Sequence, residues 1–143
     1  MNVFGILIFI LLFSGSSTAH QGNILNNVYN LPNDTNKVIA LLNLCTKYYD
    51  ISHDTSLILA KKSLSLSKEI QYKRGEVESL FRIGNDFFFL NNQKKAILYF
   101  EKAIIKAEII NAQYWIARSY RQIASVKIAN EDYNDAIILN RKA

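Results

Sequence analysis

The cysteine and the histidines are the first place to look for a nucleophile. Cys45 and His53 are the only thiol–imidazole pair from which the chain could build one. Cys45, however, shares a helical face with Leu41, Leu44 and Tyr48, and this spacing predicts a buried, apolar role for the thiol. His53 falls in an expected turn, where it would be exposed or cap a helix. We therefore expect no cysteine-based catalysis.

The acidic residues offer no second route to catalysis. A general acid needs a carboxyl group whose pKa is raised by apolar surroundings. One cysteine and two histidines cannot supply a zinc site alone, and five dispersed glycines make no phosphate-binding loop. We expect no enzyme activity, no cofactor and no metal ion. The carboxylates expected on helix surfaces or in turns are Glu76, Glu78, Glu101, Glu108, Glu131 and Asp132.

The positive charge does not indicate a nucleic-acid partner. The net charge is +5, but the densest basic clusters are only pairs, such as those at 61–62, 94–95 and 141–142. Nucleic-acid binders usually concentrate lysine and arginine on one face or in a run. Half of the residues are hydrophobic, and there are one proline and five glycines. This composition favours a compact helical protein with a solvated, charged surface.

A forty-residue repeat organises the chain that must position these side chains. Seven positions of the middle copy serve as markers, and each is paired with the position forty residues later. Five of these seven pairs keep apolar or small character. Going back forty residues from the last three markers of the middle copy gives Ser56, Ala60 and Ser63, which are again small. Three copies therefore share one register in their second helices. The markers are Leu80, Ile83, Gly84, Phe87, Ala96, Phe100 and Ala103 in the middle copy, and Tyr120, Ile123, Ala124, Lys127, Ala136, Asn140 and Ala143 in the last.

The marker spacing predicts pairs of antiparallel helices. The first four markers of the middle copy follow the i, i+3, i+4, i+7 pattern of one helical face. Asn91 and Asn92 then interrupt the pattern and predict a tight turn, because asparagine tolerates left-handed backbone geometry. A second helix is expected from about Gln93 to Ile110. The segment 130–132, Asn-Glu-Asp, predicts the equivalent turn in the last copy.

This layout resembles the tetratricopeptide repeat. That consensus places a large apolar, an apolar, a small and an aromatic residue on a first helix, then alanine, an aromatic residue and alanine on a second. The middle copy matches all seven positions and the last copy matches five, while the first copy fits if its turn is one residue shorter. The resemblance implies an all-α fold, a right-handed superhelix of antiparallel helix pairs, with about three repeats at 35–72, 73–111 and 112–143. The implied repeat-packing residues are Leu80, Ile83, Gly84, Phe87, Ala96, Phe100, Ala103, Tyr120, Ile123, Ala124 and Ala136.

The resemblance also implies a function in binding. First helices of such arrays line a concave groove that takes a peptide or a partner protein. Arg118 and Arg121 would offer forked donors to a carboxylate. The alternative is that these arginines only solvate the groove and that Phe88 packs against a neighbouring helix. The residues that the repeat positions place on the concave face are Glu78, Phe81, Asn85, Phe88, Phe89, Arg118, Arg121 and Ser125.

The length of the repeat gives a second candidate function. Forty-residue copies resemble those in exported sensory regions of bacterial signalling proteins. The alternative is therefore an N-terminal sensory fragment of a transmembrane histidine kinase or transcriptional regulator. The last copy looks cut short, and solenoid ends need a polar cap. Either the chain continues in a longer receptor, or its uncapped end pairs with another subunit as a homo-oligomer.

The N-terminus predicts export. Val3–Phe13 is an unbroken apolar run. It is too short for a bilayer span, which needs about 20 residues. We expect a signal peptide at 1–19, cleaved after Ala19; the alternative is a buried helix or an uncleaved anchor. Residues 20–34 are expected to be a linker with a short helix around Ile24–Tyr29, and 35–143 the repeat domain, whose first helix Asn33 or Asp34 would cap. The expected location is the bacterial periplasm, with membrane contact only through the signal peptide or a span beyond this sequence.

Overall fold

The computed structural model describes residues 24–143. The signal peptide and the start of the linker, at residues 1–23, lie outside the described residues. The chain divides between Pro32 and Asn33 into two units. In the first unit residues 24–29 are helical, which confirms the short helix expected there.

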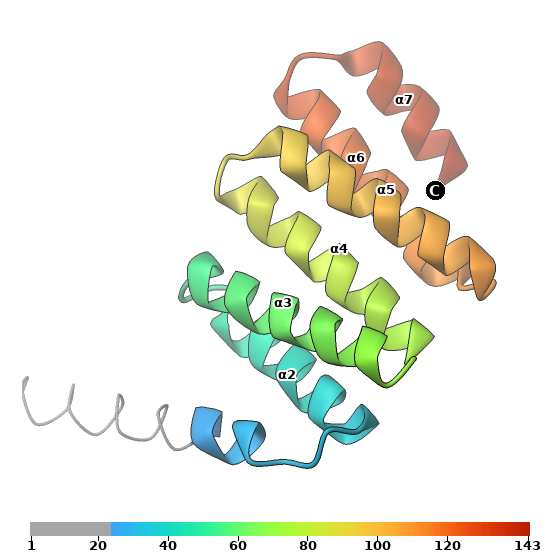
Figure 1. The fold of residues 1–143 in the computed structure, drawn as a ribbon. Coiled ribbons are helices and arrows are strands. Elements are labelled where there is room, and N and C mark those ends of the chain that lie inside the picture. Colours follow the sequence, from blue (N-terminus) through green and yellow to red (C-terminus); the bar gives the residue numbers. More distant parts are fainter. Residues whose placement is uncertain (1–23) are drawn as a thin grey trace, which may run out of the picture. The chain divides into compact units, whose positions relative to one another are not determined.

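The second unit, Asn33–Ala143, consists of six helices that pack in sequence order (Figure 1). Residues 24–143 contain no strand, so the all-α fold class is confirmed for the described part of the chain. The second to the fifth of these helices have 17 residues each, and a three-residue turn follows each of them, so two helix–turn units account for the forty-residue period. The helices are α2 (Thr35–Tyr48), α3 (His53–Glu69), α4 (Lys73–Phe89), α5 (Gln93–Ile109), α6 (Gln113–Ala129) and α7 (Tyr133–Lys142).

Four turns share one geometry. After α4, the Asn92 N–H donates to the Phe87 carbonyl at 2.8 Å and the Asn91 N–H donates to the Phe88 carbonyl at 3.0 Å. These two bonds form the Schellman motif that ends a helix with one left-handed residue. The same pair of bonds closes α3, α5 and α6. The left-handed residues are Gln71, Asn91, Asn111 and Glu131, with φ of 57°, 58°, 53° and 62°.

The first helix pair is joined differently. The connection from Tyr49 to Ser52 has four residues and no left-handed residue. The turn is therefore one residue longer than the other turns, so the shorter turn predicted for the first copy is wrong. The first copy differs because α2 ends at Tyr48, whereas α4 continues for two residues beyond the equivalent Phe87. The Asp34 carboxylate caps α2 by accepting from two backbone N–H groups, at 2.9 and 3.1 Å, as predicted.

The repeat markers form the core between the helices. Of the eleven repeat-packing residues, Tyr120 is partly exposed and the other ten are buried. Gly84 shows how closely α4 and α5 approach, because a Cβ atom placed there would lie 2.6 Å from Cε1 of Phe100. The small residue is therefore required by the aromatic ring on the facing helix.

The helices present two different faces. The first helices of the pairs touch one another, since α4 contacts α2 and α6 as well as α3 and α5. Among the described residues, the backbones of α3, α5 and α7 stay apart, with no Cα atom of one helix within 8 Å of a Cα atom of another. We call α2, α4 and α6 the first-helix face, and α3, α5 and α7 the second-helix face. The second helices therefore leave grooves between them.

Candidate functional site

Arg118 holds its guanidinium group against three aromatic rings on the first-helix face. Its Cζ lies 4.7 Å from the ring centroid of Phe81, 5.3 Å from Tyr114 and 5.4 Å from Trp115. Nη1 also donates a hydrogen bond of 2.8 Å to the Tyr114 hydroxyl. Among residues 24–143 no carboxylate forms an ion pair with Arg118. The rings fix the guanidinium but leave its charge uncompensated, so Arg118 is positioned to meet an anion.

Phe81 supports this arginine from the core. It is 1 % exposed, and its ring centroid lies 5.6 Å from Phe100 and 5.3 Å from Trp115. Phe81 is one of the residues predicted to face a partner. In the structure it lies beneath Arg118, so it orients a binding group and offers little surface of its own.

A line of polar side chains on α4 runs beside Arg118. Arg82 Nη2 lies 3.5 Å from Glu78 Oε1, one turn away. Arg82 Nε is buried without a hydrogen-bond partner in the described part of the chain. Asn85 is 6 % exposed, and its Oδ1 is likewise buried and unpaired. A buried polar group without a partner costs about 1–3 kcal/mol, so these two atoms have hydrogen bonds to gain from a ligand.

Tyr49 connects this line with the neighbouring first helices. Burial is the main cause that raises its pKa, and Asp86 and Asp50 raise it further. Arg82 and Arg118 act in the opposite direction on the same hydroxyl. Tyr49, Arg82 and Arg118 therefore lie within electrostatic reach of one another, although they come from the end of α2, from α4 and from α6.

An aromatic cluster closes one end of the site. The His53 ring stacks on Phe89 with a centroid distance of 4.7 Å and an interplanar angle of 11°. Tyr49 meets both rings edge-on at 5.2 Å, and Phe88 meets Phe89 edge-on at 5.2 Å. Phe89 remains 51 % exposed, so this cluster offers apolar surface next to the polar line.

Asp86 is a buried carboxyl group behind the aromatic cluster. It is 1 % exposed, and Ser56 Oγ donates a hydrogen bond of 2.9 Å to its Oδ2. His53 Nδ1 lies 3.5 Å from the other oxygen, Oδ1. Burial raises the pKa of Asp86 to about 6, against the opposing effect of Ser56 and His53. The three residues do not form a nucleophilic relay, because the serine hydroxyl donates to the carboxylate and not to the imidazole.

Cys45 is inert in this structure. It is 1 % exposed, and its Sγ lies 3.6 Å from the Ser56 carbonyl. Burial, with a further contribution from Asp86, raises the pKa of the thiol to about 12. The thiolate is the reactive form of cysteine, so the thiol is unreactive at neutral pH, and the buried role predicted for Cys45 is confirmed.

One predicted surface carboxylate is in the core. Glu76 is 2 % exposed and bridges two lysines, with 3.2 Å to Lys73 Nζ and 3.1 Å to Lys106 Nζ. Burial acts to raise the pKa of Glu76, but Lys106 and Lys73 outweigh it and hold the pKa below its usual value. The surface position expected for Glu76 is therefore wrong. The ion pair between Glu76 and Lys106 links α4 to α5.

The other predicted partner-binding residues lie at the edges of the same face. Arg121 is exposed, Phe88 is partly exposed, and the Ser125 hydroxyl donates to the Arg121 carbonyl at 3.0 Å. The structure thus brings Glu78, Asn85 and Arg118 together around Phe81, with Phe88 and Phe89 in the aromatic cluster. Arg121 and Ser125 lie one and two turns further along α6.

The sequence patterns did not identify five residues of this region, nor the buried role of Glu76. The five residues are Tyr49, Arg82, Asp86, Tyr114 and Trp115. Helical spacing contained a signal for Glu76 and Asp86. Glu76 stands four residues before Leu80 and so extends its apolar stripe by one turn. Asp86 stands three residues after Ile83, on the buried side of the same helix. No comparable pattern marks Tyr49 or Arg82.

The described residues contain no cluster of three or more His, Cys, Asp or Glu side chains fit to hold a metal ion. Within them, no helix combines the length and the apolar character needed to cross a membrane. No protein-family model matches the chain, and no curated protein matches it with significant similarity.

Proposed function

We propose that the chain is a tetratricopeptide-type protein-interaction module, which binds a segment of a partner polypeptide on the first-helix face. The proposal includes the right-handed superhelix expected of such repeats, in which this face is concave. The direct contacts of α4 with α2 and α6, set against the gaps between the second helices, support that curvature. The seven-position match of the middle copy supports the family.

The observation that carries the proposal is the set of unpaired polar groups around Arg118. Asn85 Oδ1 and Arg82 Nε are buried without partners among residues 24–143, and Arg118 has no counter-ion there. An extended peptide carries one N–H and one C=O per residue, which suit the carboxamide. An acidic side chain or a terminal carboxylate of the same peptide would accept from Arg118. The ligand we propose is therefore an extended, acidic peptide segment.

The arrangement favours binding over catalysis. Cys45 and Ser56 are each 1 % exposed, so neither can reach a substrate. The carboxyl group with a raised pKa, Asp86, is covered by the same packing. The groups that do face outward, Arg118 and Arg121, hold anions but transfer no proton at neutral pH.

The test is to select binders for the purified chain from a random peptide library displayed on phage, and to measure the affinity of the enriched peptides. We expect enrichment of Asp and Glu. Asn85→Ala and Arg121→Glu should each weaken binding by about tenfold, which corresponds to 1.4 kcal/mol. Arg141→Glu is the matched control, because Arg141 is also an exposed arginine but lies on α7. Peptides without an acidic bias, or equal affinity for all four proteins, would refute the site.

A further inference from the structure

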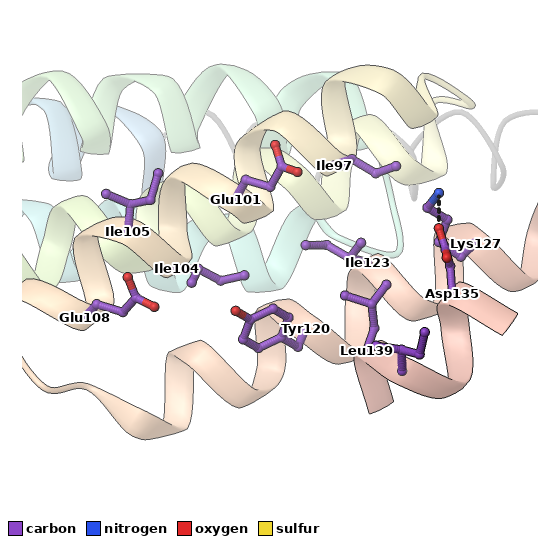
Figure 2. A pocket seen from close by; sticks show the side chains of 11 residues that line it. Ile97, Glu101, Ile104, Ile105, Glu108, Tyr120, Ile123, Lys127, Asp135 and Leu139 are labelled. Atoms are coloured by element: carbon purple, nitrogen blue, oxygen red, sulfur yellow. Dashed lines mark hydrogen bonds and ion pairs between the residues drawn. The ribbon is translucent and has the colours of Figure 1, made fainter. Parts of the chain in front are cut away.

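A groove between α5 and α7 lies on the second-helix face, away from the site described above (Figure 2). Its volume is about 720 Å³. Its apolar lining comes from three helices, with Ile104 of α5, Tyr120 and Ile123 of α6, and Leu139 of α7. A groove of this kind fits a helix that brings aliphatic side chains.

The groove is rimmed by carboxylates. Figure 2 shows Glu101 and Glu108 along α5 and Asp135 across from them on α7. Asp135 is compensated by Lys127, at 3.0 Å. Glu101 and Glu108 are exposed and make no ion pair within the described part of the chain. The occupant should therefore bring lysine or arginine beside its aliphatic side chains.

The outward-facing side of α5 carries aliphatic side chains and a lysine, which is the composition expected of the occupant. Leu98, Lys102, Ile105 and Ile109 follow one another at i, i+4, i+7 and i+11, so they form one stripe along the helix. Leu98, Ile105 and Ile109 are 45 %, 59 % and 67 % exposed. A continuous aliphatic stripe left in solvent marks an interaction surface, unlike single exposed residues.

The charge of the second-helix face reverses between repeats. The equivalent groove between α3 and α5 is also apolar, but lysines rim it, among them Lys68 and Lys102. The reversal follows the forty-residue register. The pairs of equivalent positions are Lys61 and Glu101, Lys68 and Glu108, and Lys95 and Asp135. The face therefore has a basic half and an acidic half on either side of α5.

Such a face is complementary to a copy of itself. A twofold axis that runs along the helices brings the basic half of one copy onto the acidic half of the other. We propose that two copies of the chain associate through the second-helix face, with the α5 stripe of each copy in the α5–α7 groove of the other. Lys102 of each copy then faces Glu101 and Glu108 of the other copy. Ile105 of each copy lies between those two carboxylates.

This dimer leaves the first-helix face of both copies open and does not depend on the peptide site. It is tested by sedimentation of the purified chain over a concentration series. Ile105→Glu should raise the dissociation constant of the dimer by about a hundredfold, since Ile105 is central and occurs twice in the contact. Ile51→Glu is the matched control, because Ile51 is 64 % exposed in the turn between α2 and α3. It should dimerise like the wild type.

A pair of charge-reversal variants distinguishes self-association from binding to a different partner. Lys102→Glu and Glu108→Lys should each weaken the dimer by about tenfold or more, because each places like charges opposite one another. An equal mixture of the two variants should recover most of the lost affinity, because residues 102 and 108 again carry opposite charges in both contacts of the mixed dimer. Glu101 still opposes the glutamate introduced at position 102 in one of the two contacts, so the recovery is not complete. Circular dichroism must show that each variant keeps its helices. A wild-type chain that stays monomeric throughout the series, a mixture that recovers nothing, or an unaffected Ile105→Glu variant would overturn the proposal.

Discussion

His53 and Asp86 connect the start of α3 to the last turn of α4, with 3.5 Å between Nδ1 of the imidazole and Oδ1 of the carboxyl group. Ser56, one turn further along α3, holds the other carboxyl oxygen at 2.9 Å. The contact joins the first helix pair to the second and lies behind the aromatic cluster of the first-helix face. Its protonation state therefore bears on the stability of the array.

The stability of the chain should fall as the pH rises through the titration of Asp86. Its pKa is raised from 3.8 to about 6, mainly by burial, so the folded chain holds this proton more tightly than the unfolded chain does. The stabilisation is complete below about pH 4 and is lost as the pH rises to about 6. Asp86→Asn, which cannot ionise, should lack this loss, worth on the order of 2 kcal/mol. Urea denaturation across this range compares the two proteins; parallel pH profiles would contradict the prediction.

Glu76→Gln should destabilise the fold by about 1–3 kcal/mol at neutral pH, because it leaves Lys106 and Lys73 without their carboxylate. The pKa of Glu76 is lowered, so its contribution is present at neutral pH and is lost as the pH falls through that lowered value. Glu78→Gln is the control, since Glu78 pairs with Arg82 in a partly exposed setting and the substitution should cost less than about 1 kcal/mol. Thermal unfolding distinguishes them, and equal losses would argue against the buried bridge.

Gly84→Ala should destabilise the chain by about 1–3 kcal/mol, because the new methyl group meets the Phe100 ring. The double variant with Phe100→Leu should recover part of this loss relative to Phe100→Leu alone, since the ring that blocks the methyl group is gone. A double-mutant cycle in urea measures the coupling. Additive effects of the two substitutions would show that the close approach of α4 and α5 is not the cause.

Gln71→Gly and Glu131→Gly should each stabilise the chain by about 0.5–1 kcal/mol, because glycine adopts positive φ without the penalty of a Cβ atom. Asn91→Gly should gain less, because asparagine already tolerates this geometry. Gln122→Gly, within α6, is the opposite control and should cost about 1 kcal/mol. Melting temperatures rank the four variants; a loss of stability at Gln71 and Glu131 would speak against strained turns.

The signal peptide expected from the sequence gives a prediction for the N-terminus. Expressed in a bacterium, the chain should be recovered from the periplasm and begin at His20, because Ser17-Thr18-Ala19 provides small residues before the cleavage site. Mass spectrometry of the purified chain gives its first residue. Replacement of Ala19 by arginine should block processing, and retention of Met1 in the wild type would contradict the assignment.

Local patterns predicted most of the fold. Gly84, Phe87 and Ala96 have identities that a helix pair needs at those positions, and Asn91 and Asn92 interrupt the pattern at the turn. The charged contacts were not predictable in the same way. Lys106 reaches Glu76 from another helix, thirty residues away, and Ser56 stands at the same separation from Asp86. Spacing within one helix does not reveal which partner a facing helix will bring.

The left-handed residues at positions 71, 91, 111 and 131 recur every twenty residues, so the smallest structural unit is one helix with its turn. Alternate units run in opposite directions and lie on opposite faces. Duplication or deletion of a single unit before α5 would move every later helix to the other face. Arg118 would then lie on the second-helix face, and the aliphatic stripe of α5 would lie on the first-helix face. An array of this kind keeps its first-helix face only if it grows or shrinks by an even number of units, which makes the pair, and not the helix, the step available to its evolution.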